Sequence, residues 1–125
     1  MCMDNLIDEP TDQTTAWKVM KLNNGEWRTP CLRQKPVDNK LVAKGEPNIK
    51  NKSLAGGAIH CFKSHTDAWR YVLYGVREHI FKVRGSGLVA HNKDQIAFRE
   101  VEFVENLDDV TIEVLGGQRQ AKKSE

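Results

Sequence analysis

The sequence predicts an α+β fold: a small, mostly antiparallel sheet of five or six strands, with one main helix at about residues 64–74 packed on it. Three observations predict this class. Short apolar runs with alternating polarity recur along the chain between Gly, Asn and Pro residues. Apolar residues recur at helical spacing in a single segment, which follows Ser64. The length of 125 residues suits one domain with a single modest core.

The chain divides into three predicted parts. Residues 1–14 are polar, carry four acidic side chains and show no periodicity, so we expect a flexible acidic arm. Residues 15–115 form the single α+β domain. Residues 116–125, GGQRQAKKSE, are expected to be a frayed basic tail.

The first two predicted strands form a hairpin. The runs AWKVMKL and WRTPC flank NNGE, and Asn-Asn-Gly tolerates the positive φ that tight hairpin turns require. Alternation along the first run places Val19 on one face and Met20 on the other. The long connection over residues 33–53 follows, with a brief strand expected at Lys40 to Ala43.

The segment LAGGAIHCFKSHTDAW combines a strand and a helix start. Gly57 to Phe62 is short and apolar, which predicts a buried strand. Ser64 is placed to cap the helix, with Asp67 three residues later in the position that Glu takes in a capping box. We predict that Trp69 is buried against the sheet.

The second half of the domain is predicted to be strands and turns. We expect a strand at Glu78 to Arg84, a turn at 85–87, a short strand at Leu88 to Ala90 and a polar turn at 91–94. The longest strand is expected at Ile96 to Glu105. The run LDDVTIEVL that follows fits another strand or a short helix.

Cysteine usage and the N-terminal residues indicate a cytoplasmic protein. The three cysteines are an odd number without a CxxC pair, which favours a reducing compartment. The acidic N-terminus does not resemble a secretory signal. No apolar run reaches the roughly 18–20 residues of a membrane span, so no membrane partner is expected.

Metal and nucleophile chemistry are not predicted, although His and Cys cluster. His60 and Cys61 are adjacent on a strand and face opposite sides, so they do not share one ion with His65 or Cys31. We expect Cys61 to be a small buried hydrophobic residue and His60 a hydrogen-bonded structural histidine. The chain has neither a G-x-S-x-G elbow nor a glycine-rich phosphate loop.

The basic excess lies in the first half of the domain and predicts a binding surface. Residues 33–53 carry six basic and two acidic side chains, with Leu41, Val42 and Ala43 as a small apolar centre for contact with a partner. A protein is the favoured partner and nucleic acid the alternative. The predicted partner-binding residues are Trp27, Arg28, Arg33, Lys35, Lys40, Lys44, Lys50 and Lys52.

Residues 54–107 resemble an uncharacterised family of short phage and bacterial proteins, some of which precede pentapeptide repeats. The resemblance rests on GAIHCF before a helix, the strand EHIFKVRGSG and the final HNKDQIAFREVEFVENL. Ile59 stands where that family usually has Phe. The resemblance implies a phage or prophage origin, and hence a location in the host cytoplasm, and no particular activity.

The same segment is more distantly similar to small ADP-ribosyltransferases. By position, the resemblance implies His60 on the nicotinamide side of an NAD site and Glu102, or Glu100, as the catalytic acid. Trp17-Lys18-Val19 stands where those enzymes carry an NAD-orienting Arg or His, and Lys does not replace the Arg fork.

Together with the implied phage origin, the sequence features lead us to expect an accessory protein that binds a host macromolecule, such as a host factor or defence system, without catalysis or cofactor. The alternatives are an NAD-using transferase with His60 and Glu102, and a nucleic-acid-binding protein.

Overall fold

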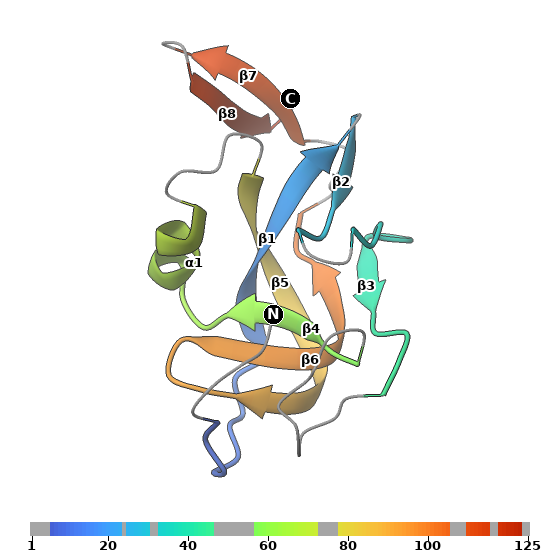
Figure 1. The fold of residues 1–125 in the computed structure, drawn as a ribbon, viewed down its shortest axis with the longest axis vertical. Helices are drawn as coiled ribbons and strands as arrows, with labels where there is room; N and C mark the ends of the chain where they lie inside the picture. Colours follow the sequence, from blue (N-terminus) through green and yellow to red (C-terminus); the bar gives the residue numbers. More distant parts are fainter. Residues whose placement is uncertain are drawn as a thin grey trace.

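The structure, a computed structural model, describes residues 6–23, 25–30, 33–46, 57–72, 78–105, 110–115 and 118–123, the last two segments as backbone. Figure 1 shows the arrangement of the elements. In chain order they are β1 (Thr15–Asn23), β2 (Glu26–Arg28), β3 (Lys40–Val42), β4 (Ile59–Phe62), α1 (His65–Val72), β5 (Glu78–His91), β6 (Gln95–Phe103), β7 (Val110–Leu115) and β8 (Gln118–Lys123).

Four strands of the six-stranded sheet close into a ring. β1 pairs with β5, β5 with β6, β6 with β4, and β4 returns to β1 at Phe62 and Trp17. β2 extends from β1 and β3 from β6, and every pairing is antiparallel. The predicted α+β class, with a mostly antiparallel sheet and one helix, is confirmed.

The main core fills the inside of this ring. Phe81, Phe103 and Met20 are almost completely buried there, and Trp27 lies beside them. The Phe81 ring meets the Phe103 ring edge-on at a centroid distance of 5.6 Å, and the Trp27 ring at 5.1 Å. Buried aromatic pairs in this geometry stabilise a core beyond the transfer of their surface from water.

Helix α1 covers the outer face of β1 and β5. Ala68 and Val72, four residues apart, pack on Val19. The predicted cap is confirmed: Ser64 Oγ accepts from the Asp67 amide at 3.1 Å and donates to the Asp67 carboxylate at 2.7 Å. The prediction that Trp69 is buried was wrong, since the residue is 54% exposed. It follows Ala68 by about 100° around the helix, and so points away from the sheet.

β5 continues through the segment where the sequence predicts a turn. Residues 78–91 form one strand, and Gly85 and Gly87 lie inside it. Gly85 lies against the Phe98 ring, and Gly87 has a φ of 70°. The register with β6 shifts between Leu88 and Ala90. The glycines therefore allow close approach and bending of a long strand, which is their other common role in sheets.

The C-terminal residues also differ from the prediction. Residues 118–123, expected to be frayed, form β8 and pair with β7 as a two-stranded hairpin. Figure 1 shows this hairpin beyond one end of the main sheet. The strand alternative for residues 107–115 is confirmed over β7. Within the described residues, no helix has the length and apolar character needed to cross a membrane.

Candidate functional site

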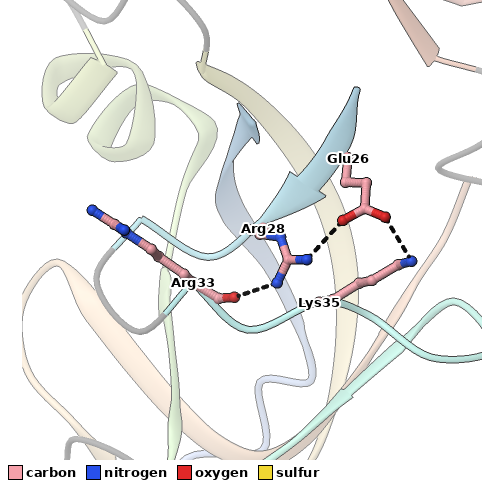
Figure 2. Close-up of polar contacts among 4 residues, drawn as sticks. All are labelled: Glu26, Arg28, Arg33 and Lys35. Carbon is pink, nitrogen blue, oxygen red and sulfur yellow. Dashed lines mark hydrogen bonds and ion pairs between the residues drawn. The ribbon is translucent and has the colours of Figure 1, made fainter. Parts of the chain in front are cut away.

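The connection from β2 to β3 carries a dense polar network, shown in Figure 2. Glu26 on β2 is its centre. One carboxylate oxygen accepts from Arg28 Nη2 at 2.7 Å, and the other from Lys35 Nζ at 3.0 Å. These bonds hold the pKa of Glu26 below its ordinary value, and the bond from Lys35 has the largest effect. Glu26 thus ties the chain at residue 35 back to the strand from which it departs.

Arg28 and Thr29 fix the backbone of the same connection. Arg28 Nη1 donates to the Arg33 carbonyl at 3.1 Å. Thr29 accepts the Arg33 amide with its carbonyl and the Gln34 amide with its hydroxyl, at 3.0 and 2.9 Å. Arg33 itself has a φ of 54°, a backbone state that a non-glycine residue adopts only when its surroundings hold it there. Figure 2 shows its guanidinium directed away from Glu26.

The structure divides the predicted partner-binding residues into exposed and internal ones. Arg33, Lys35, Lys40 and Lys44 are exposed, and Arg28 is half-buried. Lys35 is paired with Glu26, and Lys40 with Glu102 at 3.6 Å. Lys50 and Lys52 lie outside the described residues.

Two apolar parts of the predicted surface belong to the core instead. Trp27 is only 8% exposed, because its ring packs on Phe81 and His79 inside the sheet. Leu41 and Ala43 are also buried, since β3 turns them inward against β6. Val42 alone of that apolar triplet faces solvent. The prediction of an apolar contact through Trp27, Leu41 and Ala43 was therefore wrong.

Arg99 on β6 is a further residue of this region, which the sequence did not indicate. Its Nη1 atom donates to the carbonyls of Gly45 and Gly57. One guanidinium therefore joins two points of the backbone twelve residues apart in the chain. The Ala43 amide also donates to the Arg99 carbonyl at 2.8 Å. Together these bonds hold the end of β3, and Lys44 after it, against β6.

The alternative catalytic pair is not brought together. His60 stands opposite Ala97 on β6, whereas Glu102 lies five residues further along that strand. At about 3.3 Å per residue, their backbones are roughly 16 Å apart. The Glu102 carboxylate is exposed and paired with Lys40. The arrangement does not place the two side chains around one reacting bond.

His60 and Cys61 face opposite sides of β4. Burial raises the pKa of the Cys61 thiol to about 12, and the side chain belongs to the main core. Burial, with the nearby Lys18 charge, lowers the pKa of His60 to about 4. The expected hydrogen bond of His60 is not made at Nε2, which is buried without a partner among the described residues. A ring held neutral by burial tolerates that arrangement better than an imidazolium would.

Metal ligands do not cluster in the described part of the chain. No group of three His, Cys, Asp or Glu residues there is placed to hold an ion. His65 is exposed at the start of α1, while Cys31 falls outside the described residues.

Comparison with known proteins gives no match. No protein-family model, no curated protein and no solved structure matches the chain.

Proposed function

We propose that the protein is a non-catalytic binding module that contacts an acidic surface of another protein through the β2–β3 connection. The observation that carries this proposal is the rigid presentation of Arg33. Its backbone is held by Arg28 and Thr29, and its side chain is exposed. No carboxylate in the described residues lies within ion-pair distance of Arg33 or Lys44. These two cations are therefore available to a partner.

Local charge favours a protein over a nucleic acid. Glu26 and Glu102 already pair with Arg28, Lys35 and Lys40. Nucleic-acid binding draws most of its affinity from many phosphate contacts, each adding about 0.9 to the slope of log affinity against log salt. Within the described part of this connection, the two available cations, Arg33 and Lys44, supply a slope of only about 2. A few charges in fixed positions are better suited to selecting one protein surface.

The phage origin and the host partner rest on the family resemblance and belong to this proposal. They are tested by capture from a bacterial host lysate on immobilised protein, with and without nuclease. The partner recovered after nuclease treatment is then titrated in purified form at several salt concentrations. A slope of 6 or more, or loss of capture with nuclease, would indicate a nucleic-acid partner.

The site itself is tested by charge reversal with a matched control. Arg33→Glu combined with Lys44→Glu is expected to weaken binding at least about tenfold, mainly by slowing association. The control combines Lys82→Glu with Lys93→Glu, exposed residues of β5 and the β5–β6 turn, and makes the same change in net charge. Equal binding by the two double variants would refute the site.

Glu26→Gln distinguishes two explanations of binding: the fixed positions of the basic side chains, here called presentation, and the overall attraction of a positive surface for an acidic partner. The substitution makes the surface more positive, so bulk attraction to an acidic partner predicts tighter binding. Presentation predicts weaker binding, because the carboxylate no longer holds Arg28 and Lys35 in place. Tighter binding by this variant would show that the network does not organise the site.

A further inference from the structure

Residues 6–14, here called the N-terminal strap, lie beside the second half of β5, although the sequence predicts a flexible arm. The Ile7 amide donates to the His91 carbonyl at 2.8 Å, and the Gly85 amide to the Thr14 carbonyl at 2.7 Å. The Gln13 side chain donates to the Lys63 carbonyl at 3.0 Å. The strap is therefore attached at its two ends and has no regular ladder between them.

The strap covers a small apolar surface that is separate from the main core. Leu6 packs over Ala58 and Ala97, with Val89 and Ala90 at the side. Both alanines are almost completely buried. Withdrawal of the strap would expose this apolar surface. The contacts that hold the strap in place therefore control whether the apolar surface is exposed to solvent.

His91 is the residue that holds the strap most directly. Its side chain bonds on both sides and the residue is only 6% exposed: Nε2 lies 2.6 Å from the Glu9 carbonyl, and Nδ1 lies 2.8 Å from Lys63 Nζ. A carbonyl only accepts and an ammonium only donates. Nε2 must therefore carry the hydrogen, and Nδ1 must be unprotonated. Both bonds form together only with the neutral ring in this one tautomer.

Protonation of the ring breaks this arrangement. A hydrogen on Nδ1 would point at the Lys63 ammonium and place two positive charges within one hydrogen-bond length. The acidic residues that bond to this pair through their backbones are Glu9, whose carbonyl meets the ring, and Asp94, whose carbonyl accepts the Lys63 amide at 2.8 Å. Both are exposed. Within the described residues, no carboxylate comes within ion-pair distance of His91 or Lys63 to offset the repulsion.

We propose that His91 and Lys63 form a pH-sensitive latch, which holds the N-terminal strap on β5 while His91 is neutral and releases it when His91 is protonated. Release uncovers the apolar surface beneath Leu6 and leaves the main core intact. The device requires the lysine as well as the histidine. It is independent of the β2–β3 surface proposed above.

The latch is tested by NMR on the full chain. At pH 8, the ¹⁵N shifts of His91 are expected to show hydrogen on Nε2 and none on Nδ1. Between pH 8 and pH 5, the exchange protection of the Ile7 amide should fall about tenfold, as the loss of local hydrogen bonds predicts. The Phe103 amide, bonded to the Asn39 carbonyl in the core, should keep its protection. The opposite tautomer at pH 8, or equal loss at Phe103, would overturn the proposal.

Two variants identify the residues responsible. Lys63→Met removes the second positive charge, so the protection of Ile7 should then depend much less on pH. His65→Gln changes an exposed histidine at the start of α1 and should leave the response unchanged. An unaltered pH response in Lys63→Met would overturn the latch, as would loss of the response in His65→Gln.

Discussion

Gly85→Ala provides a direct test of how β5 and β6 pack. A Cβ atom at residue 85 would overlap three atoms of the Phe98 ring, namely Cγ, Cδ2 and Cε2. Non-bonded carbons normally lie about 3.5–4.0 Å apart, so the ring or the strand must move by more than about 1 Å. Phe98 is 2% exposed in the main core, which leaves it little room to move.

Overpacking of this kind in a dense core costs about 1–3 kcal/mol, and the severe overlap places Gly85→Ala near 3 kcal/mol. At roughly 4 °C per kcal/mol, the melting temperature should fall by about 12 °C. Urea unfolding, followed by tryptophan fluorescence and circular dichroism, gives the loss in free energy directly. Gly25→Ala is the control, because its Cβ meets nothing within 4 Å. Its φ of 80° leaves only backbone strain, about 1–2 kcal/mol.

A double-mutant cycle links the loss to the named contact. Phe98→Leu alone should lower the free energy of unfolding by about 1–2 kcal/mol. In the double variant with Gly85→Ala, the total loss should be smaller than the sum of the two single losses by at least about 1 kcal/mol. A loss below about 0.5 kcal/mol in Gly85→Ala would refute the steric argument. So would strict additivity of the two substitutions.

Three further predictions concern β4 and α1. The pKa of His60 is lowered from 6.5 to about 4 in the folded chain, so as the pH falls the unfolded chain binds a proton at this residue before the folded chain does. The contribution of His60 to stability is therefore full above about pH 6.5 and is lost as the pH falls toward 4. After allowance for the partial exposure of the ring, the loss is about 1–2 kcal/mol, and urea unfolding of His60→Gln at pH 7.5 and 4.5 should show a smaller loss than the wild type. Val72→Ala should lower the free energy of unfolding by about 2 kcal/mol, and Trp69→Ala, at a more exposed residue, by under about 1 kcal/mol. Equal melting temperatures for the two variants would contradict this order. The Cys61 thiol, with its pKa raised to about 12, should resist iodoacetamide until the chain unfolds, and mass spectrometry of its peptide after brief native labelling would detect any exception.

Local features of the sequence determined most of the secondary structure. Alternation predicted β1 and placed Val19 and Met20 on opposite faces of it, and the structure buries both, Met20 inside the ring and Val19 under the helix. The Ser64–Asp67 pair fixed the start of α1. These predictions succeeded because capping and side-chain alternation depend on residues only two to four positions apart.

The sequence alone did not reveal the partners of single side chains. Alternation did not show that Trp27 would turn into the core, or that glycines 85 and 87 would continue a strand. The Glu26–Lys35 pair joins residues nine positions apart, and the Lys63–His91 contact residues twenty-eight apart. The second contact depends on how the ring of β1, β5, β6 and β4 closes, since Lys63 follows β4 and His91 ends β5. The tertiary structure decided the contact between Lys63 and His91, because closure of the ring brings together strands whose separation in the chain carries no information about distance in space.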